Sequence, residues 1–128
     1  MHGKRLKVAQ QLTLKESLIA SGFPADQKGA LPQNLKSMVH LAPLVRNIRT
    51  SGAAALHLAY LAAGRITGFW EMSLNSWDLA AGSLLIQEAG GRVTDLDGLS
   101  YHLGVRDVVA SNGFIHDALL AELKESRK

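Results

Sequence analysis

The stretch from Trp77 to Asp95 reads WDLAAGSLLIQEAGGRVTD and joins a helix signal directly to a strand signal. Apolar residues recur at helical spacing over residues 77–89, which predicts an amphipathic helix. The side chains predicted to face the core are Trp77, Ala81, Leu84, Leu85 and Ala89. Gly90-Gly91 ends this helix, because glycine readily adopts the left-handed conformation that closes helices. Residues 92–96 are then typical of a strand that runs into a turn at Asp97-Gly98.

The same alternation extends toward both ends of the chain. Strands are predicted at residues 4–8, at the end of 16–23, and at 44–49, 65–72 and 105–111, with helices at 32–40, 52–63 and 116–125. This order predicts the α/β class, with a layered, mixed but largely parallel sheet flanked by helices. We expect N-terminal strands and a loop over residues 1–30, followed by one α/β domain over residues 31–128.

Composition narrows the classes of function. The 128 residues include 14 Lys and Arg against 11 Asp and Glu, and the basic excess lies near the two ends, so we expect no nucleic-acid partner. The absence of cysteine excludes disulfides and a cysteine nucleophile, and it favours a reducing, cytoplasmic location. The longest mostly apolar stretch, residues 53–63, is about half of what a membrane span needs, so we expect no membrane association.

Two strand-to-helix junctions hold the candidate site. Glu71 lies at the carboxyl end of the strand predicted at residues 65–72, and Asp78 lies in the first turn of the next helix, with Ser76 as its candidate N-cap. Carboxylates at the carboxyl ends of strands face the crevice where α/β sheets bind ligands, and they suit Mg²⁺. Asp78 is also explained by a simpler role, in which it complements the helix dipole.

The second junction is the segment Gly52-Ala53-Ala54, where a strand leads into an alanine-rich helix. Free backbone N–H groups at a helix start attract anions, and small side chains let an oxygen-rich ligand come close. The alternative is that these small residues only allow the helix to pack tightly on the sheet.

The chain resembles the inositol monophosphatase family. The resemblance rests on the stretch of residues 77–95 followed by Asp97-Gly98, and on four further segments. These segments are GAAALHLAYLAAG at residues 52–64, FWE at 69–71, VASNG at 109–113 and GKRLKVA at 3–9. The likeness covers essentially the whole chain and implies the C-terminal half of that family's αβαβα sandwich.

By this resemblance the protein hydrolyses phosphate monoesters of inositol or related sugars with Mg²⁺. Asp78 would correspond to the aspartate that binds metal and touches the substrate, and Glu71 to the glutamate that accepts hydrogen bonds from inositol hydroxyls. Gly52, Ala53 and Ala54 would line the substrate pocket through their backbone. Metal ions in such a site polarise the phosphoryl oxygens and activate a water molecule.

The chain also departs from the family pattern. The family's Asp-Pro-x-Asp-Gly-Thr loop and upstream glutamate, which supply most metal ligands, are absent, because no proline here follows an aspartate. One carboxylate cannot hold a dinuclear Mg²⁺ site, so we expect the 128 residues alone to be inactive. Met1 would then be an internal start or mark a truncated gene. Residue 57 is histidine where the family often has Asp or Asn.

Other readings stay open. The chain could be a non-catalytic half-domain that binds a partner, or a homo-oligomer, in which another chain supplies the missing half. The substrate could instead be histidinol phosphate, fructose bisphosphate or a nucleotide 3′-phosphate. Asp95 and Asp97 are expected to belong to a turn, Trp70 and Trp77 to be core or interface anchors, and His57 to be structural. The remaining histidines, expected at the surface, are His2, His40, His102 and His116.

Overall fold

The computed structural model describes residues 6–23, 29–50, 53–74, 76–102 and 104–128, and only the backbone of residues 76–78. In this part of the chain a five-stranded sheet has the order β2-β1-β3-β5-β4. Its strands are β1 (Leu18–Ser21), β2 (Asn47–Thr50), β3 (Gly68–Glu71), β4 (Arg92–Asp95) and β5 (Val108–Ser111). β1 is parallel to β2 and β3, whereas β5 is antiparallel to β3 and β4. Only β5 opposes the common direction, which confirms the mixed, largely parallel sheet.

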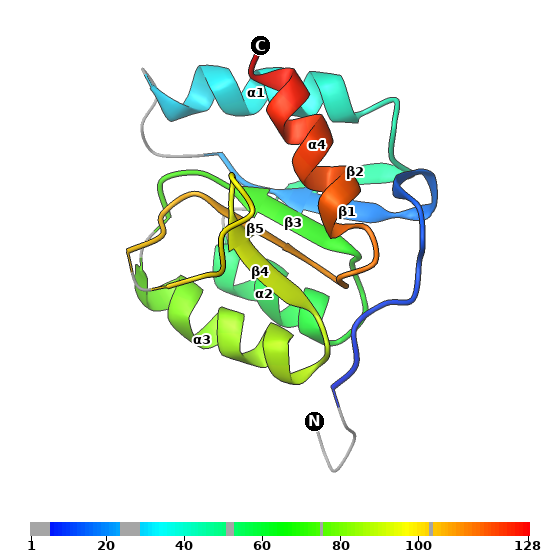
Figure 1. The fold of residues 1–128 in the computed structure, drawn as a ribbon, viewed down its shortest axis with the longest axis vertical. Helices are drawn as coiled ribbons and strands as arrows, with labels where there is room; N and C mark the ends of the chain where they lie inside the picture. Colours follow the sequence, from blue (N-terminus) through cyan, green and yellow to red (C-terminus); the bar gives the residue numbers. More distant parts are fainter. Residues whose placement is uncertain (1–5, 24–28, 51–52, 75, 103) are drawn as a thin grey trace.

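Helices cover both faces of this sheet (Figure 1). The helices α1 (Ala30–Leu41) and α4 (His116–Ser126) lie on one face, and α2 (Ala54–Ala62) and α3 (Ser76–Glu88) on the other. A short 3-10 helix, η1 (Leu14–Glu16), precedes β1. The predicted helices all form close to their expected bounds, and the α/β class is confirmed. Within the described ranges, no helix has the length and apolarity that a membrane crossing requires.

Alternation along the strands builds two cores, because successive side chains point to opposite faces of a sheet. Phe69 lies in the core beneath α2 and α3, whereas its neighbour Trp70 lies in the core beneath α1 and α4. Trp70 is therefore a core anchor, as predicted. β1, from the segment 1–30, lies between β2 and β3, so that segment shares the sheet. The division of the chain at residue 30 stays a prediction.

The strand predicted at residues 4–8 is wrong for its described part. Residues 6–8 form no strand, and residues 4 and 5 lie outside the described ranges. The backbone N–H of Val8 donates to the carbonyl of Ala89, 3.2 Å away, after the end of α3, so this segment attaches to a helix end instead of a sheet ladder. The other predicted strands form but are shorter. β2 begins at Asn47 because the chain first completes a turn, in which the N–H of Leu44 donates to the carbonyl of Leu41.

The buried face predicted for α3 is also wrong. Leu84 is 58% exposed and Leu85 37%, and Ala81 is exposed as well. Of the predicted face, Ala89 is buried just beyond the helix, as predicted, and the other residues that face the core are Leu79, Gly82, Ser83 and Ile86. A Cβ atom added to Gly82 would lie 2.5 Å from Leu58 Cδ1 of α2. The close approach of the two helices selects a face with small residues, whereas the pattern of large apolar residues pointed to the opposite face.

The surface location predicted for His116 is wrong, since its side chain is fully buried at the start of α4. Its Nε2 lies 2.8 Å from the hydroxyl of Thr94 in β4, and its Nδ1 lies 2.8 Å from the hydroxyl of Ser111 in β5. Two hydroxyl groups therefore satisfy both ring nitrogens inside the core. His102 is exposed, as predicted, and His40 is half-buried at 3.1 Å from Glu122 Oε1.

Candidate functional site

Three parallel strands end together at one edge of the sheet, which we call the carboxyl edge. Their last residues are Ser21 in β1, Thr50 in β2 and Glu71 in β3, and the register aligns Ser21 with Thr50 and with Trp70. α2 follows β2 and α3 follows β3, so both helices begin at this edge. Ligands of open α/β sheets bind outside the carboxyl ends of the strands, which makes this edge the candidate site.

Glu71 is the predicted site residue that the structure places most clearly. It is the last residue of β3, and only 7% of it is exposed. An ionised carboxylate accepts hydrogen bonds and donates none, so Glu71 suits a ligand that presents hydroxyl groups. β1 separates β3 from β2, so Glu71 lies about 10 Å from the end of β2, two strand spacings away.

The start of α2 brings the second predicted segment to the same edge. Ala53 is the N-cap residue, with extended backbone (φ −127°, ψ 90°), and its own side chain makes no capping hydrogen bond. Ala53 is exposed and Ala54 is buried. Gly52 lies outside the described residues. A helix start is suited to oxygen atoms of a ligand, because its first N–H groups point outward from the helix.

Asp78 lies in the first turn of α3, as predicted. The helix begins at Ser76, one residue before the expected start, so Ser76 is inside the helix and not before it. The side chains of Ser76, Trp77 and Asp78 lie outside the described part of the structure. The backbone nevertheless brings the Asp78 position and Glu71 to the two ends of one short connection, residues 72–75.

Sequence reasoning missed Asp107, which contacts this connection. The backbone N–H of Ser73 donates to Asp107 Oδ1 at 2.9 Å, and the N–H of Leu74 donates to the carbonyl of Arg106 at 2.9 Å. Ser73 has φ +59° and is the only non-glycine residue with positive φ in the described ranges. No local signal in the sequence connects residues 73 and 107, because only the β3–β5 pairing brings them together.

A buried hydrogen-bond network connects α1 to the carboxyl ends of β1 and β3. Trp70 Nε1–H donates to Asn34 Oδ1 at 2.6 Å, and Asn34 Nδ2–H donates to the carbonyl of Gly22 at 2.8 Å. The hydroxyl of Ser21 donates to the carbonyl of Trp70 at 2.7 Å. Asn34, in α1, thus holds Trp70, the residue before Glu71, and Gly22, the residue after β1. Its polar side chain inside a predicted helix was the only signal in the sequence.

His57 packs in the core, and the Asp95–Asp97 pair belongs to a turn. His57 is buried in α2 with its ring centroid 5.5 Å from that of Phe69, and burial lowers the pKa of its imidazole. Asp95 Oδ1 accepts the backbone N–H groups of Asp97 and Leu99 at 2.8 and 2.9 Å. This confirms that the two aspartates belong to a turn, in which Gly98 has φ +87°.

The described residues do not complete a metal site. Among them, no group of three or more His, Asp and Glu side chains could hold a metal ion. The described donors at the carboxyl edge therefore do not by themselves fit the dinuclear Mg²⁺ site of the resemblance.

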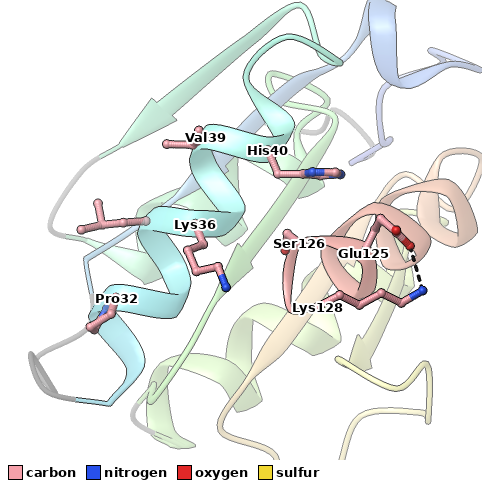
Figure 2. A pocket seen from close by; sticks show the side chains of 8 residues that line it. Pro32, Lys36, Val39, His40, Glu125, Ser126 and Lys128 are labelled. Atoms are coloured by element: carbon pink, nitrogen blue, oxygen red, sulfur yellow. Dashed lines mark ion pairs between the residues drawn. The ribbon is translucent and has the colours of Figure 1, made fainter.

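A cavity of about 520 Å³ lies away from Glu71, in the groove between α1 and α4. Figure 2 shows Lys36 and His40 of α1 on one side of this groove and Glu125 and Lys128 on the other. Lys128 Nζ lies 3.2 Å from Glu125 Oε2, which neutralises that cation. The residues that line the groove come from α1 and from the C-terminal end of the chain and do not include Glu71, so the groove does not extend the candidate site.

A family model described as "Inositol monophosphatase family" matches residues 1–128. The inositol-1-monophosphatase of Mesorhizobium japonicum is 44% identical over 125 residues, which cover 98% of this chain and 47% of that protein. The Nus factor SuhB of Pseudomonas aeruginosa is 41% identical over 97% of this chain and 46% of its own length. The chain thus spans about half the length of these curated relatives.

Solved structures agree with these sequence matches. The native crystal structure of the extragenic suppressor protein SuhB from Bartonella henselae has a TM-score of 0.89 and 38% identity, and it covers 97% of this chain and 48% of that one. The inositol monophosphatase from Anabaena has a TM-score of 0.88 and 38% identity over 94% of this chain and 48% of that one.

Proposed function

The chain belongs to the inositol monophosphatase family, and from this we propose that it forms the C-terminal half of a Mg²⁺-dependent phosphatase. The substrate proposed is inositol monophosphate or a related sugar phosphate monoester. The observation that carries the proposal is the buried carboxylate of Glu71 at the carboxyl edge, between the starts of α2 and α3.

The proposed roles follow from the chemistry of each position. Glu71 accepts hydrogen bonds from substrate hydroxyls, since a carboxylate offers acceptors only. The backbone of Gly52, Ala53 and Ala54 approaches the substrate, because these residues have almost no side chain. Asp78 is the one Mg²⁺ ligand that we assign to this chain, and the other ligands would come from outside the described residues. We also propose a cytoplasmic location, which the absence of cysteine supports.

The first test concerns Asp78. In the longest natural polypeptide that carries this chain, Asp78→Asn should abolish Mg²⁺-dependent phosphate release from inositol 1-phosphate. Asp97→Asn is the matched control, since Asp97 is an exposed turn residue, and it should keep wild-type activity. Histidinol phosphate, fructose bisphosphate and a nucleotide 3′-phosphate belong in the same assay as competing substrates. Full activity of Asp78→Asn, or loss in both variants, would refute the role of Asp78.

A second candidate is a binding half-domain whose partner, or a further copy of the chain, covers an apolar surface. This candidate is favoured by the exposure of Leu84 and Leu85 on α3 and by Leu56 on α2, which is 45% exposed. Light scattering on the purified chain tests this candidate. A stable, monodisperse oligomer would favour the binding function, whereas a monomer would count against a further copy of the chain as the partner.

A further inference from the structure

The connection between β3 and α3 is held by the segment that enters β5. Two consecutive N–H groups, those of Ser73 and Leu74, donate to two consecutive residues, Asp107 and Arg106, each over 2.9 Å. β3 and β5 are paired antiparallel, with Glu71 opposite Val108, so the two segments leave the sheet side by side. The contact at Asp107 is made by a side chain, and a carboxylate acceptor makes a stronger hydrogen bond than a neutral one.

The backbone at Ser73 needs such a restraint. Its φ of +59° lies in the left-handed region, which residues with a Cβ atom adopt only at a cost in free energy. Conformations of this kind persist where the surroundings enforce them. Met72 and Leu74 on either side are buried, which anchors the connection to the core, while the hydrogen bond to Asp107 accounts for the bend between them.

We propose that Asp107 is a positioning residue for the phosphatase site. Its carboxylate holds the left-handed bend at Ser73 and thereby sets the position of Glu71 relative to the first turn of α3. This inference rests on the proposed function, which assigns Glu71 before the bend to the substrate and Asp78 after it to Mg²⁺. Catalytic groups need placement to a fraction of an ångström, so a loosened connection should reduce the rate even though Asp107 touches no substrate.

The experiment compares Asp107→Ala with Asp107→Asn in the longest natural polypeptide that carries this chain. Asparagine keeps an Oδ1 acceptor, whereas alanine removes it. We expect Asp107→Ala to lower kcat/KM for inositol 1-phosphate by about 10- to 100-fold, the range seen when a supporting residue is lost. Asp107→Asn should stay within about fivefold of wild type. Asp117→Ala is the control, since Asp117 is exposed on α4 and pairs with Arg92, and it should leave kcat/KM unchanged.

Amide hydrogen exchange gives a readout that does not depend on activity. Exchange at Ser73 and Leu74 should accelerate in Asp107→Ala and remain slow in Asp107→Asn. If Asp107→Ala does not fold, Asp107→Glu replaces it, because the extra methylene moves the carboxylate away from the Ser73 N–H while it keeps the charge. Asp107→Glu should then lose more activity than Asp107→Asn.

Wild-type kcat/KM in Asp107→Ala, or unchanged exchange at Ser73, would overturn the positioning role and leave the proposed function intact. A wild-type protein that releases no phosphate from any of the esters would overturn the proposed function and the positioning role together. Rescue by asparagine together with restored protection at Ser73 would support the inference.

Discussion

His116 is the single residue whose ionisation most clearly depends on the fold. Thr94 donates its hydroxyl hydrogen to the carbonyl of Asp95 at 2.8 Å, so His116 must donate from Nε2 to Thr94. The hydroxyl of Ser111 then donates to Nδ1 and accepts the N–H of Gly113 at 3.0 Å. In this arrangement the ring carries its proton on Nε2 and accepts a hydrogen bond at Nδ1. Burial, together with the nearby Arg92, lowers the pKa of His116 from 6.5 to about 4, although Asp117 opposes this shift.

This pKa makes the fold sensitive to acid. Between pH 6.5 and about 4 the unfolded chain binds a proton at His116 that the folded chain does not, so the free energy of unfolding falls as the pH falls. The stability of the fold is not reduced by this linkage above pH 6.5. As the pH falls to 4, the free energy of unfolding decreases by about 3 kcal/mol. Urea unfolding of wild type and His116→Gln across this range measures it. The difference between the two should shrink with acid, and a difference that does not change with pH would contradict the assignment. His102→Gln is the exposed control.

At the scale of elements, the contact between α2 and α3 decides which face of α3 is buried. Glycine to alanine usually stabilises a helix interior by about 1 kcal/mol. At Gly82 the added Cβ would lie 2.7 Å from Leu58 Cβ, so steric overlap should outweigh that gain and destabilise the fold by about 1–3 kcal/mol. Leu84→Ala should change the stability of the 128-residue chain by less than about 0.5 kcal/mol, because Leu84 is exposed. Urea unfolding of both variants tests this. A larger loss of stability in Leu84→Ala than in the Gly82→Ala variant would support the buried face predicted from sequence.

The elements themselves were predictable because their signals are local. Gly64 and Gly90 adopt positive φ after α2 and α3, as their positions after apolar helical segments indicate. The face of α3 was not predictable, since it depends on how closely Leu58 approaches Gly82. Asp107 and His116 were missed for the same reason. Ser73 lies 34 residues from Asp107 and Thr94 lies 22 residues from His116, and pattern analysis along one chain carries no information about such contacts.

At the scale of the whole molecule, the main question is what the chain does by itself. The sequence resemblance pointed to the right family, and the structure places Glu71 and the starts of α2 and α3 at one edge. The described residues nevertheless hold no metal-binding group of three or more side chains. We therefore expect the purified 128-residue chain to release no phosphate from inositol 1-phosphate above the buffer rate at any Mg²⁺ concentration. Mg²⁺-dependent release that Asp78→Asn abolishes in this chain would contradict that expectation.

The most direct test of the central claim, that the carboxyl edge carries the substrate site, is kcat/KM of Glu71→Gln with inositol 1-phosphate. The measurement uses the longest natural polypeptide that carries the chain. Glutamine fills the same space without the charge, so the loss expected is about 10- to 100-fold, corresponding to one or two hydrogen bonds to a charged group. The matched control is Glu88→Gln, at an exposed position in the last turn of α3, which should match wild type. A Glu71→Gln variant with wild-type kcat/KM would contradict the account.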